Sequence, residues 1–378
     1  MLYNSPRSYV HRVILVVLCA LVASSCFADD AASRYIREQL RLRHTPGAAV
    51  AVIRGGRVLE EVVYGSASLQ LRVPVRRDTQ FQLASVTKVF TGLALLMLEQ
   101  NGQVSLDDPV SKYLTGLPGS WRNVSLRELA SHTSGLPDVI ESPNRPLSPE
   151  ELERTEDQAL QFAESKPIPA APGEKFIYDQ TNYVLLKRVI EHVTHMNFQG
   201  FITTHILPQT SPPWLWGDCR AIVPLRTEMY KLGSGNVVEN AGELYAYPPY
   251  LQAAAGLNAS IAQMEKFGEA LTRGAILSSR ELGRLEEPIR TRSGRAVEMG
   301  ELSLQGRLAP SIGFIFADNS GGRIPRVLMT GGSAVVVMYF PKQQLVVVVL
   351  TNLQTAGDPI ETTEGVARFY IHGLVPIF

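Results

Sequence analysis

Ser85 and Lys88 are the residues whose types and spacing first suggest chemistry. An α-helix has 3.6 residues per turn, so side chains three positions apart share one face. A serine hydroxyl is a weak nucleophile until a base takes its proton, and a lysine acts as that base only when its pKa is lowered. Burial and the positive end of a helix both lower it. The pair suggests nucleophilic catalysis, with helix N–H groups available to stabilise an oxyanion.

The competing interpretation is a serine that caps a helix and a lysine on its surface. A four-residue motif of common residues occurs by chance, and alone it favours this structural role. The surrounding sequence changes the balance, because apolar residues precede the serine from Phe81 and continue through Met97. This pattern predicts a buried apolar helix over residues 86–100 that carries the motif at its start.

Longer stretches of the chain resemble the serine β-lactamase and penicillin-binding protein superfamily. FQLASVTKVFTGLALLMLEQNGQVSLDDPVSKYLTGLP resembles its nucleophile helix and following loop, and APGEKFIYDQTNYVLLKRVIE its second catalytic element. Further similar elements follow the family order in LRELASHTSGLPD, AAAGLNASIAQMEKF and MTGGSAVVVMYFPKQQLVVVVLTNL. The most similar branch holds class C β-lactamases, D-aminopeptidases and related esterases. The resemblance runs from about Arg43 onward.

The resemblance implies catalytic roles for three residues. Ser85 would be acylated, and Lys88 would accept its proton, which are the roles of the serine and the lysine in this superfamily's Ser-x-x-Lys motif. Tyr178 matches the family's catalytic tyrosine and, as a tyrosinate or neutral phenol, would relay protons to the leaving group. Gln180 stands where the family usually has asparagine, and its longer amide keeps the same donor and acceptor groups for a substrate amide.

The third family element departs from the usual pattern at its first residue. Thr330, Gly331 and Gly332 match it as substrate-binding residues, and the N–H of Gly332 would join that of Ser85 in the oxyanion hole. The family usually has a lysine or histidine before them, where this chain has Met329. Methionine cannot pair with a substrate carboxylate. We therefore expect an esterase or a peptidase rather than an effective β-lactamase.

Apolar segments at both ends of the chain define the expected fold. A helix is expected over residues 30–43, a strand hairpin over 48–64, and a second hairpin from the runs 327–340 and 345–350. Helices are expected over 124–131, 182–195 and 261–273. The fold class is α/β (α+β) of the β-lactamase-like type, with an antiparallel sheet formed by both termini, flanking helices and an all-helical insertion, roughly residues 85–270.

The N-terminal residues have the pattern of a secretory leader. Basic residues precede an apolar run over 13–22, which is short for a bilayer span and is followed by small residues. Cleavage after Ala28 is favoured, which makes 1–28 a signal peptide and 29–378 the serine hydrolase domain. A poorer lipoprotein pattern at Cys26 leaves a lipid anchor as the alternative. We expect an exported protein, periplasmic or secreted, with no membrane contact after simple leader cleavage.

Composition excludes several partners and cofactors. Lys plus Arg and Asp plus Glu both number 36, so no net charge attracts nucleic acid or anionic lipid. His192, His195 and His205 lie close in sequence but lack carboxylate or cysteine partners at ligand spacing, so no metal is expected. No organic cofactor is implied either. Cys219 has no motif around it and is assigned to packing.

Three further residues are weighed as site candidates. His132 lies in a polar turn, and a lone histidine there is interpreted as a loop-stabilising hydrogen bonder. Trp214 and Trp216 either line a pocket for an apolar substrate group or cover the core.

The sequence predicts hydrolysis of an ester or amide in a small-molecule or peptide substrate. The alternative is a penicillin-binding-protein-like sensor or binding protein that has lost activity, which Met329 and Gln180 favour and the intact Ser85, Lys88 and Tyr178 oppose.

Overall fold

Both ends of the chain contribute strands to one antiparallel sheet, as the two apolar hairpins predict. The computed structural model describes residues 31–142, 145–241, 246–299, 308–317, 324–354 and 359–375. The eight strands of this sheet follow the order β3-β2-β1-β13-β12-β11-β10-β9. β1 (Gly47–Arg54) pairs with β2 (Arg57–Ser68) and with β13 (Leu345–Thr351), so the N-terminal hairpin joins the C-terminal strands at the sheet's centre. The remaining strands are β3 (Val73–Pro74), β9 (Leu308–Pro310), β10 (Ile315–Ala317), β11 (Arg326–Gly331) and β12 (Val335–Phe340).

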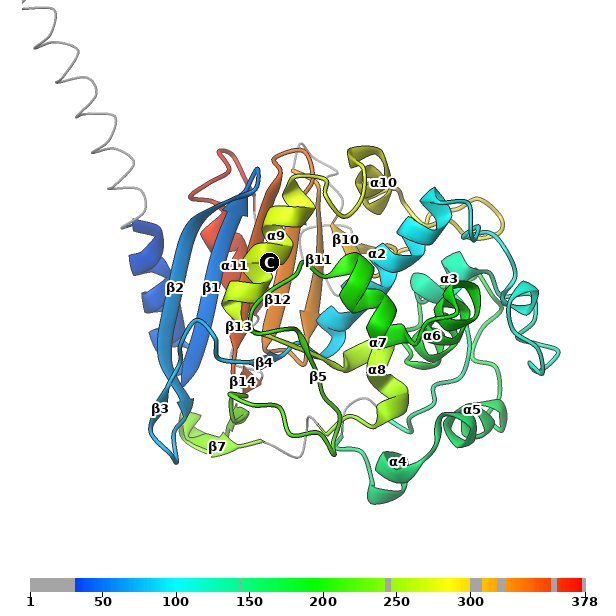
Figure 1. Ribbon diagram of the computed structural model, residues 1–378, viewed down its shortest axis with the longest axis horizontal. Coiled ribbons are helices and arrows are strands. Elements are labelled where there is room, and N and C mark those ends of the chain that lie inside the picture. Colours follow the sequence, from blue (N-terminus) through cyan, green and yellow to red (C-terminus); the bar gives the residue numbers. More distant parts are fainter. Residues whose placement is uncertain are drawn as a thin grey trace, which may run out of the picture.

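Helices cover both faces of this sheet, which explains why its central strands are apolar throughout. In β1, Ala49, Ala51 and Ile53 join the core on one face, whereas the residues between them join the core on the other. α9 (Ile261–Thr272) packs on β1 and β13 on the first face. The helix over residues 31–42 and α11 (Pro359–Ala367) cover the second face (Figure 1).

The apolar run 327–340 forms two strands rather than the single strand expected from the sequence. β11 ends at Gly331 and β12 begins at Val335. Gly332 and Ser333 have φ values of 56° and 53°, and the N–H of Ala334 donates to the carbonyl of Gly331 at 3.0 Å. Two successive positive φ values define the tight hairpin turn that matches strand twist. This two-residue turn is too short to interrupt the apolar pattern visibly.

The segment between β3 and α9 lies beside the sheet and combines helices with short strands, so the insertion expected from the sequence is not all-helical (Figure 1). Short strands accompany its helices. β4 (Phe81–Gln82), β8 (Leu257–Ala259) and β5 (Leu215–Trp216) form one small sheet, and β6 (Tyr230–Leu232) and β7 (Val238–Asn240) form another with β14 (Leu353–Gln354). The helices are α2 (Thr87–Gln100), α3 (Leu126–Ala130), α4 (Pro149–Glu153), α5 (Glu156–Glu164), α6 (Thr181–Thr194), α7 (Phe198–Phe201) and α8 (Gln252–Ala255). α9, placed at the end of the predicted insertion, belongs to the layer on the sheet.

α2 is the central helix of this arrangement. It contacts α6, α8 and β11, and its residues from Thr87 through Leu96 are all buried. A helix enclosed on every side is apolar all round, which accounts for the continuous apolar sequence around Lys88. Among the described residues, no helix combines the length and the apolar character that crossing a membrane requires. The predicted signal peptide and the alternative anchor at Cys26 lie outside the described residues.

Candidate active site

Ser85 lies in a short 3-10 turn, η1 (Ala84–Val86), that leads directly into α2. Ala84 has a φ of 45°, a left-handed conformation that costs energy for a residue with a Cβ. Two elements hold this turn. The N–H of Leu83 donates to Leu257 of β8 at 2.9 Å, and Gly331 of β11 lies so close that a Cβ there would meet the carbonyl oxygen of Leu83 at 2.1 Å. Ser85 therefore sits on a strained turn that neighbouring strands fix in place.

Lys88 is fully buried, one helical turn after Ser85, and its contacts fit a neutral amine. Its Nζ lies 3.3 Å from the Oγ of Ser85, 2.9 Å from the Oε1 of Gln180 and 3.0 Å from the carbonyl oxygen of Ala254. Both carbonyl groups only accept hydrogen bonds, so in the neutral form of Lys88 the two N–H bonds go to them and the lone pair faces the Ser85 hydroxyl.

The electrostatics of the site also favour the neutral form of Lys88. Burial lowers the pKa of Lys88 to about 7, against the opposing effect of the Asp138 and Asp179 carboxylates. A base with this pKa is half deprotonated near neutral pH, which suits proton abstraction from a serine.

Tyr178 completes the contacts of the serine. Its hydroxyl donates to the Oγ of Ser85 at 2.7 Å. Burial raises the pKa of Tyr178, and hydrogen bonds with Ser85 and Gln180 only partly oppose this. Of the two forms considered from the sequence, the structure therefore favours the neutral phenol, which is a proton donor.

Gln180 closes a ring of hydrogen bonds through these side chains. Its Oε1 accepts from Lys88, and its side chain is also hydrogen-bonded to Tyr178. With the amide oriented by Lys88, the remaining NH₂ group donates to the tyrosine oxygen. The ring runs from Gln180 to Tyr178, to Ser85, to Lys88 and back. Gln180 is buried, but its NH₂ group has a second N–H, so the substrate binding predicted for it is compatible with the ring and stays a prediction.

The third predicted element meets the site through its backbone. Met329 of β11 is 3% exposed and packs in the core on the α2 side of the sheet. Thr330, the next residue, pairs with Val336, whose side chain belongs to the core of the opposite face. Alternation along a strand turns the Thr330 side chain away from the α2 side. Any substrate contact by Thr330 therefore comes from its main chain.

The glycines of this element differ in what the structure shows. Gly331 contacts the turn before Ser85, as its closeness to Leu83 requires. Gly332 begins the β11–β12 turn, and its predicted part in an oxyanion hole stays a prediction.

His132 packs behind the tyrosine. Its ring centre lies 4.3 Å from that of Tyr178, and its Nδ1 accepts from the backbone N–H of Asp179 at 3.3 Å. Burial and the nearby Lys88 lower the pKa of His132 well below its ordinary value. A neutral imidazole that holds the chain behind Tyr178 agrees with the loop-stabilising interpretation.

Sequence reasoning did not single out two carboxyl groups near Lys88. Asp138 accepts from the backbone N–H groups of Gln180 and Ile140, at 3.1 and 3.3 Å. Asp179 accepts from the backbone and side chain of Asn182, at 3.0 and 2.6 Å. Burial raises the pKa of both, to about 6 for Asp138 and well above the ordinary value for Asp179. Both residues lie within segments that resemble the family. Their acidic side chains inside these segments were the only sign in the sequence that could have pointed to them.

The two tryptophans cover the core. Trp214 packs edge-on against Phe90 of α2, and Trp216 against Phe198 of α7. Each indole N–H has a partner, the carbonyl of Pro208 at 2.8 Å and the hydroxyl of Thr203 at 3.2 Å. Of the two roles left open for them, the structure shows the packing one. Cys219 is a half-buried free thiol, and partial burial raises its pKa.

The chain belongs to the β-lactamase family, whose family model matches residues 32–369. Protein flp of Staphylococcus aureus (strain MW2) is 32% identical over 176 residues, which cover 46% of this chain and 35% of that protein. Penicillin-binding protein 4* of Bacillus subtilis (strain 168) is 26% identical over 283 residues, covering 70% of this chain and 60% of that protein. The match therefore spans less than two thirds of the length of either relative.

Solved structures share the fold at low sequence identity. The octameric penicillin-binding protein homologue from Pyrococcus abyssi has a TM-score of 0.73 and 22% identity, covering 92% of this chain and 78% of that one. EstCE1, a hydrolase with promiscuous acyltransferase activity, has a TM-score of 0.70 and 19% identity, covering 90% and 99%. A D-stereospecific amidohydrolase from Streptomyces sp. has a TM-score of 0.69 and 22% identity, covering 91% and 99%. The β-lactamase-like fold expected from the sequence is thus confirmed.

Proposed function

We propose that this protein is a serine hydrolase that forms an acyl-enzyme at Ser85 and transfers the acyl group to water. The supporting observation is the ring of hydrogen bonds in which the buried amine of Lys88 lies 3.3 Å from the Oγ of Ser85 and has neutral carbonyl oxygens, and no carboxylate, as its other direct partners. An amine in this state is a base, whereas a protonated surface lysine is not. The fold that the chain shares with a hydrolase that has promiscuous acyltransferase activity and with a D-stereospecific amidohydrolase supports the same class.

Each proton in the proposed reaction has a named carrier. The Ser85 hydroxyl gives its proton to the Nζ of Lys88 as its Oγ bonds to the carbonyl carbon of the substrate. As the bond to the leaving group breaks, the leaving group takes a proton from the Tyr178 hydroxyl, and the protonated Lys88 then gives its proton to the tyrosinate, so that both groups are neutral again. Water next attacks the ester at Ser85 and gives one proton to Lys88, which passes it to the serine oxygen as the bond to the acyl group breaks. One ester or amide and one water therefore give an acid and an alcohol or amine.

The substrate we propose is neutral near its reacting carbonyl. Met329 occupies the position where the family usually supplies a cation, and it is buried among apolar side chains. A carboxylate that enters the site would lose hydration there without a charged partner from this position. Neutral esters, or amides without a nearby carboxylate, avoid that cost.

The test is covalent labelling. A fluorophosphonate probe should modify the protein, and peptide mapping should place the adduct on Ser85, with Ser85→Ala unlabelled and Tyr178→Phe labelled more slowly. An adduct on another residue, or full ester turnover by Ser85→Ala, would refute the assignment. A protein that binds penicillin reversibly but is neither labelled nor active on any ester would instead be the non-catalytic sensor.

We further propose export of the protein through its N-terminal leader. The basic start and short apolar run support this, as do small residues before Ala28. Expression with residues 1–28 fused to a reporter that folds only outside the cytoplasm measures it directly. A reporter that stays inactive would contradict export.

A further inference from the structure

The segment that carries Tyr178 and Gln180 is held in place by a loop from elsewhere in the insertion. Residues 174–179 form neither helix nor strand, so their position depends on contacts outside the segment. Four hydrogen bonds connect residues 177–181 to residues 132–138, which we call the Asp138 loop. They run from Ile177 N to His132 O (2.8 Å), Asp179 N to His132 Nδ1 (3.3 Å), Gln180 N to Asp138 Oδ1 (3.1 Å) and Thr181 Oγ1 to Pro137 O (2.7 Å).

Asp138 makes the contact nearest to the catalytic ring. Its carboxylate accepts the backbone N–H of Gln180, the residue whose side chain bonds both Lys88 and Tyr178. Gln180 is also the last residue before α6, so this bond fixes where the helix begins and how the glutamine side chain leaves the backbone. Gln180 thus links the two groups, because its backbone N–H donates to the Asp138 carboxylate and its side-chain oxygen accepts from the amine of Lys88.

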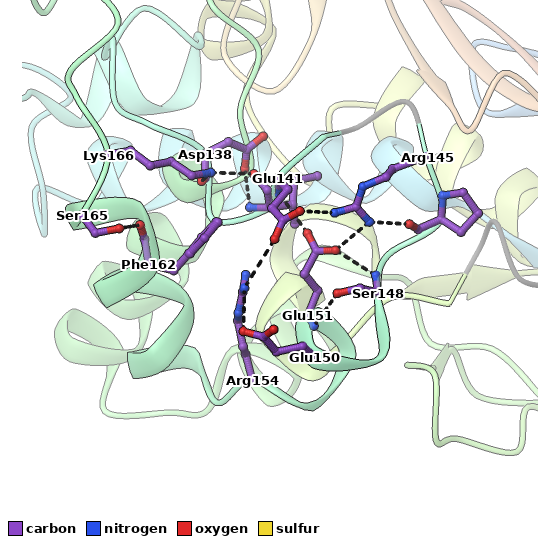
Figure 2. A network of polar contacts seen from close by, with 12 residues as sticks. Asp138, Glu141, Arg145, Ser148, Glu150, Glu151, Arg154, Phe162, Ser165 and Lys166 are labelled. Atoms are coloured by element: carbon purple, nitrogen blue, oxygen red, sulfur yellow. Dashed lines mark hydrogen bonds and ion pairs between the residues drawn. The ribbon is translucent and has the colours of Figure 1, made fainter.

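Asp138 is itself anchored from the side away from the catalytic ring. The Nζ of Lys166 donates to the carbonyl oxygens of Asp138 and Ile140 at 2.8 and 3.0 Å. Figure 2 shows this amine beside Asp138, with the ring of Phe162 next to it. The ring lies between two cations, 4.0 Å from the Nζ of Lys166 and 3.9 Å from the guanidinium of Arg154. Cation–π contacts on both faces restrict Lys166 and so restrict the Asp138 loop.

We propose that Asp138 is a positioning residue of the reaction, which holds Gln180 so that Gln180 presents the amine of Lys88 to Ser85. The proposal rests on the hydrolase function proposed above. It assigns Asp138 a role that neither its half-buried position nor its distance from Ser85 in the sequence indicates.

The charge of Asp138 gives the proposal a second consequence. Burial raises the pKa of Asp138, whereas the backbone N–H groups of Gln180 and Ile140 and the positive charges of Lys166 and Lys88 oppose that rise. Asp138 in turn raises the pKa of Asp179, the other carboxyl group that interacts with Lys88. The Asp138 carboxylate also favours the protonated form of Lys88, so it raises the pKa of that lysine. Removing the charge should lower the Lys88 pKa and move the acidic limb of the activity profile to lower pH.

Two substitutions separate geometry from charge. Asp138→Asn keeps an oxygen that can accept the N–H of Gln180 but has no charge, whereas Asp138→Ala removes both. We expect Asp138→Asn to keep kcat within a few-fold above pH 8 and to move the acidic limb of kcat/KM down by about half to one pH unit, as a single charge within a protein does. We expect Asp138→Ala to lose on the order of 100-fold in kcat with little change in KM, because a catalytic group displaced by about 1 Å costs that much.

A measurement without substrate keeps this test independent of the proposed function. In protein labelled at lysine Cε, carbon NMR follows the titration of Lys88 in Ser85→Ala and in Ser85→Ala with Asp138→Asn. The signal is assigned by its loss in Lys88→Arg. Asp157→Asn, the same change at an exposed carboxylate on α5, is the matched control and should leave both the titration and the profile unchanged.

The outcomes are distinct. A Lys88 titration that moves down in Asp138→Asn, with a kcat loss confined to Asp138→Ala, supports the positioning role. A Lys88 titration and pH limb equal to wild type in Asp138→Asn, together with full kcat in Asp138→Ala, would overturn it. If the wild type has no hydrolase activity, the proposed function fails, and the NMR titration alone decides whether Asp138 acts on Lys88.

Discussion

Among the residues that the structure describes, the basic side chains of Lys88 and Arg326 are both buried, and their surroundings differ completely. Lys88 is 0% exposed on α2, with neutral carbonyl oxygens around its amine. Arg326 is 1% exposed at the start of β11, on the opposite face of the sheet, and forms an ion pair with the equally buried Glu364 of α11. The guanidinium also donates to the carbonyl of Ile324 at 3.1 Å.

The comparison shows how one protein uses burial for two purposes. An arginine cannot lose its proton in a protein, so its burial requires a carboxylate partner. A lysine can lose its proton, and burial without a directly bonded carboxylate drives it to do so. The Arg326–Glu364 pair joins α11 to the sheet, whereas the lysine on the other face is kept as a base.

Lys88→Arg tests the chemical half of this comparison and has the largest expected effect. The substitution keeps the positive charge but removes the ability to accept a proton at neutral pH. We expect the acylation rate with a p-nitrophenyl ester to fall by about 1000-fold or more, within the upper range attributed to general base catalysis. Stopped-flow measurement of the p-nitrophenol burst gives the rate directly. Acylation at the wild-type rate would make Lys88 purely structural.

Glu364→Gln tests the structural half. It removes the carboxylate that is ion-paired with the buried guanidinium of Arg326, and breaking a buried ion pair from one side typically costs about 3–5 kcal/mol of stability. Urea unfolding should show this loss, while activity per folded molecule stays unchanged because the pair lies across the sheet from Ser85. The double variant Arg326→Met with Glu364→Leu removes both charges and should recover most of the stability. A double variant as unstable as Glu364→Gln would contradict the explanation by a broken ion pair.

The pH dependence of activity sharpens the comparison, because only one of the two cations titrates near neutrality. The pKa of Lys88 is lowered to about 7, so the amine is charged and inactive at lower pH and becomes a base as the pH rises through 7. We expect kcat/KM for a neutral ester to fall about tenfold per pH unit below this value, as for any single essential base. A pH–rate profile from pH 5 to 9 measures it. A profile that is flat from pH 5 to 7 would mean that Lys88 is not the base.

The sequence was sufficient to predict the elements whose hydrophobic pattern extends over many residues. The helix that follows Ser85 and carries Lys88 was expected over 86–100 and is α2, because a fully enclosed helix has to be apolar throughout. The turn at Gly332 and Ser333 was not foreseen, since two residues within a run of valines leave the hydrophobic pattern almost intact.

The ring of hydrogen bonds around Lys88 could likewise be predicted from the sequence only in part. Ser85 and Lys88 are neighbours in sequence, so helical spacing predicts their contact. The partners Gln180 and Ala254 are 92 and 166 residues from Lys88, and only the tertiary fold brings them there. The role of Asp138 depends on a backbone N–H, which carries no sequence signal at all.

Met329→Lys has the smallest expected effect. It tests whether a positive charge at this position changes the preference between neutral and anionic substrates. Wild type should cleave short p-nitrophenyl esters with a higher kcat/KM than nitrocefin, because the site lacks the usual cation for the carboxylate of nitrocefin. Lysine at this position would supply one, and we expect the ratio of the two kcat/KM values to shift toward nitrocefin by about tenfold, the size of one charge-assisted hydrogen bond. Met329→His should shift it in the same direction.

The buried setting of Met329 sets the control for this experiment. The side chain packs in the apolar core, so a lysine there is partly desolvated and the variant should lose stability as well. Met329→Leu conserves volume without charge, and it should leave the substrate ratio unchanged. Because a general loss of stability lowers both activities together, only a change in their ratio reports a contact with the substrate carboxylate. A wild type that prefers nitrocefin would show that another group binds that carboxylate, and a ratio unchanged in the lysine and histidine variants would show that position 329 does not face the substrate.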